Sequence, residues 1–390
     1  MRSFLPNSVV AMFLAVASHA VAQVTLTPLV GFGGDDGWLA PGDSTTDFVN
    51  GSGSTERGLA YNPITNHLLL TSRTGTPAMN VRILDSATGL DLGGLSVPAA
   101  TVTGGTFPIN QVKVADDGAI YVGNLASPGA TVPFKIYRWA DELPTTQPTV
   151  AFNATNSPTP ARLGDNLDII GSGTDTKIVA GESTSGANTG NGYVVYGTAN
   201  GTTFNTATKV TFPLSPAAGG TINGEFNRGL TFLENSTNVA GKNTNTSALR
   251  LSSYDPATGT GTLLGSPAAT GSMIEFAEVG GVPLLATLNM ASTTAGSEAS
   301  SVVRLYDLTD RSNPLLLASS DLTTVTTSAG GAVGSLAWGP IVGNTARLYA
   351  LSVNNGIQAF VVTVPEPSTA VLVCCCAAAL AMRRRRGSVG

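Results

Sequence analysis

The segment Arg57-Gly58-Leu59-Ala60-Tyr61 is a short apolar run typical of a buried strand, and it returns later in the chain. It is echoed by Arg228-Gly229-Leu230-Thr231-Phe232 and, more loosely, by Gly334-Ser335-Leu336-Ala337-Trp338. Related starts occur at Ile109–Val114, Asn166–Ile170 and Met273–Phe276. The six starts lie roughly 45 to 60 residues apart, which leaves room for about four short strands in each interval. Four strands repeated about an axis form the blades of a β-propeller.

Turn signals between the apolar segments support this prediction. Asp116-Asp117-Gly118 separates two apolar runs within Gln111–Gly123 and predicts a hairpin. The pattern Asp-x-x-Thr-Gly occurs at Asp85–Gly89 and again at Asp255–Gly259. An aspartate at the start of such a turn caps backbone N–H groups, while the final glycine takes a positive φ. The sequence therefore predicts strands joined by tight turns and little helix.

The six starts predict an all-β propeller of six blades. A seventh blade would require the N-terminal stretch to form part of a blade of its own. Val24–Val30 is only one strand long, so we expect it to complete the last blade, beside Gly334–Trp338, Ala346–Val353 and Ile357–Val362. Pairing of the chain ends in this way removes exposed sheet edges. A pair of β-sandwiches or an irregular β-solenoid remain as alternatives.

Val302–Asp307 reads Val-Val-Arg-Leu-Tyr-Asp, which is close to the strand pattern x-V-x-V-Y-D, and Thr-Gly turns follow the strands that end at Leu84 and Tyr254. In this respect the body resembles bacterial YVTN-type and SMP-30-like propellers. No motif selects one of these families.

Composition limits the partners of the body. Without Arg2, Arg383–Arg386 and Glu366 the chain has 15 basic and 24 acidic residues, a formal net charge of −9. This sign argues against nucleic acid or an anionic lipid surface as a partner. All three cysteines lie in Cys374–Cys376, so the body can form no disulfide.

The N-terminus has the features of a secretory signal. Arg2 is followed by the apolar run Val9–Val16 and by an A-x-A site formed by Ala20 and Ala22. Residues 1–22 are therefore expected to be removed, which leaves residues 23–364 as the propeller domain.

The C-terminus combines a proline-rich motif, an apolar run and a basic stop. Pro365, Glu366 and Pro367 precede fourteen uncharged residues, Thr369–Met382, which as a helix would span about 21 Å. This is short for a hydrocarbon core of roughly 30 Å. The arginines that follow should stay on the cytoplasmic side and leave the body outside. They are Arg383, Arg384, Arg385 and Arg386.

This tail, residues 365–386, resembles the PEP-CTERM sorting signal of bacterial envelope proteins; residues 387–390 follow it. The resemblance implies a short hydrophobic helix held transiently in the inner membrane and cut near Pro-Glu-Pro by an exosortase-type protease. It also implies bacteria that make exopolysaccharide. The triple cysteine departs from the usual Leu, Ala and Gly. A plain C-terminal anchor is the alternative.

Residues that carry chemistry are sparse. His67 is the one histidine of the mature chain, and its place at a turn beside Asn66 favours a structural role over a catalytic one. No cofactor is required, although hard oxygen donors on predicted loops are candidates for calcium. These candidates are Asp116, Asp117, Asp165 and Asp168. Arg57 and Arg228 precede the expected innermost strands and could bind an acidic or sugar ligand in the central funnel.

Two functions are open at this point. The first expectation is a non-enzymatic, exported binding or matrix protein that associates with exopolysaccharide. The alternative is a calcium-dependent propeller hydrolase or lactonase that uses Asp165, Asp168 and Glu182 in the funnel.

Overall fold

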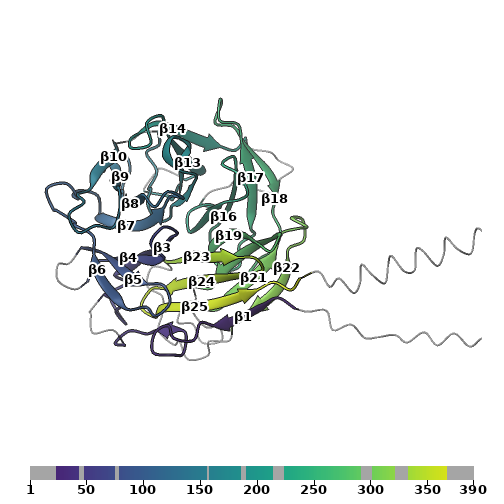
Figure 1. Cartoon of the computed structure of the whole chain (residues 1–390). Coiled ribbons are helices and arrows are strands. Elements are labelled where there is room, and N and C mark those ends of the chain that lie inside the picture. The colour runs from purple at the N-terminus through teal and green to yellow at the C-terminus, as the bar shows by residue number, and fades with distance from the viewer. Residues whose placement is uncertain are drawn as a thin grey trace, which may run out of the picture.

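The chain folds as a six-blade β-propeller, shown in a computed structural model (Figure 1). The structure describes residues 23–43, 48–74, 79–155, 158–185, 190–213, 224–290, 301–320 and 333–366. Six antiparallel sheets surround a central axis. In five of them the strands follow one another outward in sequence order, and in the sixth the last three strands of the described chain are completed on the outside by N-terminal strands. The prediction of an all-β propeller with six blades is confirmed.

The strands fall into six sheets. The first blade has β3 (Glu56–Asn62), β4 (His67–Ser72), β5 (Asn80–Asp85) and β6 (Asp91–Gly94). The second has β7 (Phe107–Val114), β8 (Ile120–Leu125), β9 (Phe134–Trp139) and β10 (Thr149–Ala154). The third has β11 (Asp168–Ile170), β12 (Lys177–Gly181), β13 (Gly192–Thr198) and β14 (Phe204–Thr211), with the 3₁₀ turn η1 (Gly173–Asp175) after β11. The fourth has β15 (Gly229–Phe232), β16 (Asn238–Lys242), β17 (Arg250–Tyr254) and β18 (Gly261–Gly265). The fifth has β19 (Met273–Val279), β20 (Val282–Leu288), β21 (Val303–Asp307) and β22 (Leu315–Ser319). The sixth has β23 (Gly334–Val342), β24 (Thr345–Ser352), β25 (Gly356–Thr363), β1 (Thr25–Pro28) and β2 (Trp38–Leu39).

The two ends of the described chain meet in the sixth blade. Strand β1 pairs antiparallel with β25, so that Leu26 lies opposite Val362 and Pro28 opposite Phe360. In Figure 1 the purple β1 runs beside the yellow β25. This closure was expected from the length of the N-terminal strand, and it covers an edge of the last sheet that would otherwise be open.

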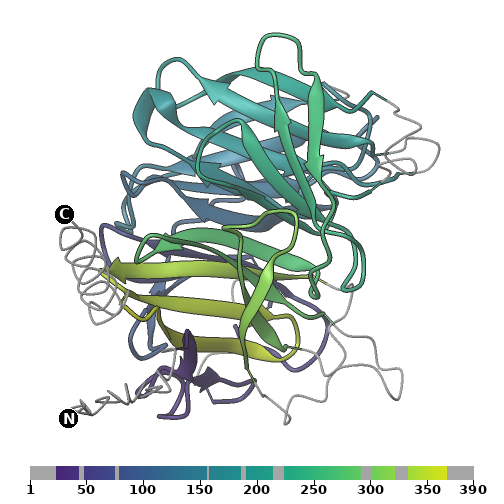
Figure 2. The same ribbon diagram turned by 90° about the vertical axis from the view of Figure 1, so that its right-hand side faces the viewer.

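Apolar side chains fill the space between neighbouring blades, whose sheets Figure 2 shows turned by 90° from the view in Figure 1. Tyr121 and Ile136 of the second blade pack with Ile178 and Tyr196 of the third, and all four are buried. Because both faces of each sheet are covered in this way, the inner strands are apolar runs rather than alternating ones.

The repeated Arg-Gly-Leu start has a steric reason. A Cβ at Gly58 would lie 2.5 Å from the backbone nitrogen of Val112, and one at Gly229 would lie 2.2 Å from the carbonyl oxygen of Ser272. Each of these neighbours belongs to the next blade. Glycine thus lets adjacent inner strands approach closely where they enter the centre.

The predicted turns form as expected. Asp85 Oδ1 accepts hydrogen bonds from the N–H groups of Ala87 and Thr88, and Gly89 has a φ of 75°. The second copy of the pattern repeats this geometry, since Asp255 Oδ1 accepts from Ala257 N and Gly259 has a φ of 68°.

Most of the predicted export features lie outside the described residues. These are Ala20, Ala22, Pro367, the apolar helix and Arg383–Arg386. Pro365 and Glu366 follow β25 in irregular backbone. Within the described ranges, no helix has the length and apolar character that a membrane span requires.

Candidate functional site

Each innermost strand has one residue at an equivalent position, and in every blade this residue directly follows a buried leucine, isoleucine or valine. In chain order these are Ala60, Lys113, Asp168, Thr231, Glu275 and Ala337. Five of them line one cavity of 520 Å³ at the axis, and the sixth, Thr231, hydrogen-bonds Asp168. We call this cavity the carboxylate pocket.

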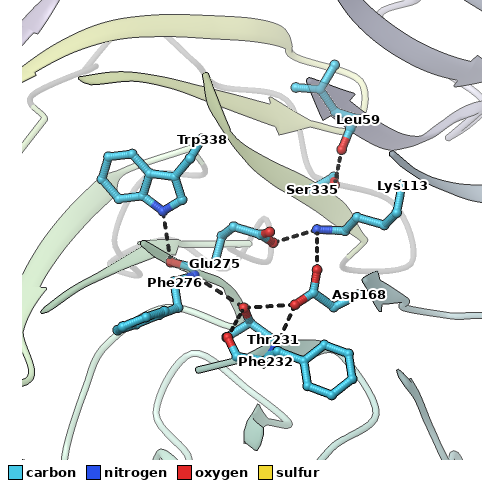
Figure 3. A network of polar contacts seen from close by, with 9 residues as sticks. All are labelled: Leu59, Lys113, Asp168, Thr231, Phe232, Glu275, Phe276, Ser335 and Trp338. Carbon is cyan, nitrogen blue, oxygen red and sulfur yellow. Dashed lines mark hydrogen bonds and ion pairs between the residues drawn. The ribbon is translucent and has the colours of Figure 1, made fainter. Parts of the chain in front are cut away.

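Lys113 joins two carboxyl groups in the floor of the carboxylate pocket (Figure 3). Its Nζ donates to Glu275 Oε2 at 2.6 Å and lies 3.2 Å from Asp168 Oδ1. An ammonium has three protons to donate, so one remains for a further partner. The side chains of Lys113, Asp168 and Glu275 are only 9%, 6% and 15% exposed, so their charges interact with little screening by water.

Asp168 is held by donors from the fourth blade. Its Oδ2 accepts from the backbone N–H of Phe232 at 2.6 Å and from the hydroxyl of Thr231 at 3.1 Å. Its Oδ1 lies 3.2 Å from Lys113 Nζ, so these contacts together hold Asp168 where it positions Lys113. Glu275 has fewer fixed partners and faces the cavity.

The three groups differ in their affinity for protons. Burial is the main reason that the pKa of Glu275 rises to about 8; the Asp168 carboxylate raises it further, while Lys113 opposes the rise. For Lys113, burial would lower the pKa, but the carboxylates of Glu275 and Asp168 together raise it above its usual value. At neutral pH the cluster therefore holds a lysine cation and a glutamic acid that can lose its proton within the physiological range.

Aromatic and apolar side chains form the wall of the carboxylate pocket. Tyr61, Phe276 and Trp338 line it together with prolines at positions 63 and 340. Trp338 Nε1 donates to the backbone oxygen of Glu275 at 3.3 Å, which links the wall to the floor. An apolar wall over a few convergent polar groups is the usual make-up of a small-molecule site.

A second cavity, of 240 Å³, lies at the start of the inner strands, and Arg228 and Arg162 line it. We call this cavity, lined by Arg162 and Arg228, the arginine mouth. Of the two arginines named from the sequence, Arg228 lines this cavity, while Arg57 lies in β3, where its backbone oxygen accepts from Gln111 Nε2. Their binding of a ligand stays a prediction. A smaller space of 20 Å³ beside Leu230 lies between the two cavities, and residues of both cavities line it.

The calcium candidates separate into different places. Asp117 caps its own turn, accepting from Ala119 N and Gly173 N. Asp165 is bound by Arg162 at the arginine mouth, and Asp168 by Lys113 in the carboxylate pocket, whose lining also includes Asp116. The described residues contain no group of three or more carboxylate, histidine or cysteine side chains that could hold a metal. The donors named for calcium do not lie together in one site, and the reaction proposed below uses no metal ion.

Two further sequence candidates have structural partners. Glu182, suggested for the funnel, is fully buried, with its Oε1 3.2 Å from Lys209 Nζ. His67 begins β4, and its Nδ1 lies 2.6 Å from Glu142 Oε2. No pattern in the sequence predicts the contact of His67 with Glu142.

Lys113 and Glu275 were missed from the sequence as functional residues. A signal for them exists, because each is a charged residue inside an otherwise apolar inner strand. Aligning the six starts brings them to the same position as Asp168, which was named as a calcium candidate and as a funnel carboxylate of the alternative hydrolase.

Comparison with known proteins gives similarity in fold only. No known protein family matches the chain, and no curated protein matches it. Solved structures similar to it include a gluconolactonase from Xanthomonas campestris, with 10% identity and a TM-score of 0.46 over 89% of this chain and 99% of that one. A calcium-binding protein, regucalcin, from Agrobacterium tumefaciens has 14% identity and a TM-score of 0.47 over 80% and 92%. An α-L-arabinofuranosidase from Fusarium graminearum has 11% identity and a TM-score of 0.48 over 81% and 96%.

The expectation that the chain is not an enzyme is contradicted by these matches, because the first and third are enzymes by name. We withdraw it. None of the three names indicates a matrix protein. The low identities and TM-scores transfer no substrate and no residue role to this chain.

Proposed function

We propose that the chain is a hydrolase of small esters, lactones included, and that the carboxylate pocket is its active site. The observation that carries the proposal is the contact of Lys113 with Glu275 at 2.6 Å in the floor of a 520 Å³ cavity with an aromatic wall. A cation beside a carboxyl group supplies the two functions that ester hydrolysis needs, namely charge stabilisation and proton transfer.

The chemistry assigns one role to each residue. Ionised Glu275 accepts a proton from water while the water oxygen forms a bond to the ester carbonyl carbon. The carbonyl oxygen gains the electron pair and is stabilised by the remaining proton of Lys113. The bond to the alcohol oxygen then breaks, and that oxygen takes the proton from Glu275. A lactone yields one hydroxy acid, and an open ester yields an acid and an alcohol.

Glycoside hydrolysis fits the pocket less well. It uses two carboxyl groups that both face the sugar. Asp168 already accepts from Lys113, Thr231 and Phe232, so its oxygens are occupied by the protein. We therefore assign Asp168 the role of positioning Lys113. For the same reason we favour ester hydrolysis over glycoside hydrolysis.

The pH dependence of the rate tests this function. Because the pKa of Glu275 is about 8 and the ionised form is the base, the rate should rise about tenfold per pH unit below 8 and level off above it. We would measure hydrolysis of a panel of γ- and δ-lactones and aryl esters by the full chain between pH 5.5 and 9.5. Absence of hydrolysis across the panel, or a rate that falls as pH rises to 8, would contradict the proposal.

We also propose that the protein is exported and sorted to the cell envelope by an exosortase-type protease. The support for this proposal is the apolar run Val9–Val16 ahead of the A-x-A site at Ala20 and Ala22, together with the apolar run Thr369–Met382, which is too short for an ordinary membrane span. Intact mass of the protein from its native cells should give an N-terminus at Gln23 and a C-terminus near Pro365–Pro367. Retention of Arg383–Arg386 in the mature protein would contradict the processing step.

A further inference from the structure

The aromatic wall of the carboxylate pocket offers rings rather than hydrogen-bond donors. Tyr61 donates its hydroxyl to Asn66 Oδ1 at 2.9 Å, and Trp338 Nε1 donates to the backbone oxygen of Glu275 (Figure 3). Phe276 has no side-chain donor. All three aromatic side chains are half-buried, with one part packed against an apolar core while the residue also lines the cavity. A ligand that touches this wall therefore meets the π-systems of the rings.

This wall is a poor match for a sugar. A sugar lactone carries several hydroxyl groups, and each needs a hydrogen-bond partner when it is buried. Apart from the aromatic residues and Asp116, the wall consists of alanine, valine, isoleucine, proline and glycine, whose side chains provide no such partner. The pocket therefore favours an ester with few hydroxyl groups.

The polar lining of the pocket carries an excess of negative charge. Lys113 is the one cation among the described residues that line the cavity, whereas three of them have carboxyl groups: Asp116, Asp168 and Glu275. Lys113 forms ion pairs with Asp168 and Glu275, so its charge is already shared between these two. When Glu275 is ionised, as hydrolysis requires, the lining has more negative than positive charge. An anionic substrate would be repelled.

Asp116 is the carboxylate of this lining without a cation. It follows β7 in the turn to β8 and is exposed to solvent at the rim of the cavity. Partial burial is the main reason that its pKa is raised; the neighbouring Asp117 adds to the rise, and a backbone hydrogen bond from Gly171 opposes it. None of these groups is a cation, so a positive charge on a ligand would supply the missing compensation.

We propose that the carboxylate pocket selects esters whose alcohol part carries an alkylammonium group, an inference that rests on the function proposed above. The ammonium group lies against the aromatic wall with Asp116 beside it, because aromatic rings attract cations and a carboxylate adds to that attraction. The ester carbonyl lies at Lys113 and Glu275, as in the reaction already described. A cavity of 520 Å³ accommodates an ester of this kind.

Acetylcholine and its uncharged carbon isostere, 3,3-dimethylbutyl acetate, test the selection with the full chain. The two esters have nearly the same shape and differ in charge. Acetylcholine should be hydrolysed with a kcat/KM at least about tenfold higher, because the ring and carboxylate contacts act on the cation alone. Equal kcat/KM values for the two esters would overturn this inference and leave the hydrolase function in place.

Binding of the product alcohols distinguishes failure of this inference from failure of the proposed function. Choline and 3,3-dimethylbutanol contain no ester, so calorimetric titration measures their affinities whether or not the protein is a hydrolase. Choline should bind at least about tenfold more tightly than its isostere. Such binding without hydrolysis of either ester would support the cation site and contradict the hydrolase function. Choline that does not bind, or binds no more tightly than its isostere, would overturn the cation site.

Paired variants assign the cation contact to individual residues. Tyr61→Leu should lower the preference for choline over its isostere about three- to fivefold, whereas Tyr61→Phe keeps the ring and should retain the preference. Asp116→Asn should lower it by a similar factor, and the matched control is Asp175→Asn, an exposed aspartate outside the cavity lining. An unchanged preference in both Tyr61→Leu and Asp116→Asn would refute the site. Thermal unfolding identifies a variant that fails to fold; if Tyr61→Leu does, Asp116→Asn decides.

Discussion

Replacing Glu275 with glutamine is expected to lower the rate of lactone hydrolysis by about 10² to 10⁴-fold, the range typical of a lost general base. Glutamine preserves the size of the side chain and can still accept a hydrogen bond from Lys113, but it cannot take a proton from water. The rate that remains should also lose its dependence on pH around 8. The measurement is the pH–rate profile of the variant on the best lactone of the panel.

Glu278→Gln is the matched control for this prediction. Glu278 lies on the same strand, β19, but is exposed rather than turned to the floor of the pocket. The control should retain the rate and the pH profile of the unchanged protein. If Glu275→Gln retained them as well, Glu275 could not be the base and the carboxylate pocket would not be the active site.

Replacing Lys113 with methionine is expected to lower the free energy of unfolding by about 3 to 5 kcal/mol at pH 8, because removal of one partner leaves buried charge uncompensated. Lys113 forms ion pairs with both Asp168 and Glu275, so the variant leaves two buried carboxyl groups close together with no cation between them. Their protonation relieves this repulsion, so the loss should shrink as the pH falls from 8 to 5. Urea unfolding at the two pH values measures the effect.

A double variant distinguishes lost charge compensation from lost packing. Adding Glu275→Gln to Lys113→Met removes one of the unpaired acids, so the double variant should be more stable at pH 8 than Lys113→Met alone. Lys177→Met, at the half-exposed start of β12, should change stability by no more than about 0.5 kcal/mol. A loss at Lys113 that is equal at pH 5 and pH 8 would show that packing, rather than charge, accounts for it.

Local patterns predicted much of the fold. The six starts became the inner strands β3, β7, β11, β15, β19 and β23. The Asp-x-x-Thr-Gly turns and the pairing of Val24–Val30 with the last blade formed as expected, the latter as β1 with β25. These features depend on backbone geometry and on hydrogen bonding between strands that are adjacent in the blade, and both leave a periodic signal in the sequence.

The candidate site left a weaker signal. Asp168 was named as a calcium candidate and as a carboxylate of the alternative hydrolase, but its partners Lys113 and Glu275 were not named at all. Arg57 and Arg228 were singled out because their motif repeats, whereas Arg162 has no repeated setting in the sequence. A charged residue within an apolar strand can face either a salt-bridge partner or solvent, and the strand alone does not distinguish the two.

The sequence by itself predicted the strand order and the closure of the ring, and it favoured six blades over seven, because strand periodicity and turn chemistry act over a few residues. Only the tertiary structure decided which residues meet at the axis. Lys113 and Glu275 are 162 residues apart, yet their atoms lie 2.6 Å from each other. That contact exists because close packing of the blades brings all six inner strands to the axis in the same register, and the same packing removes the water that would otherwise screen the charges.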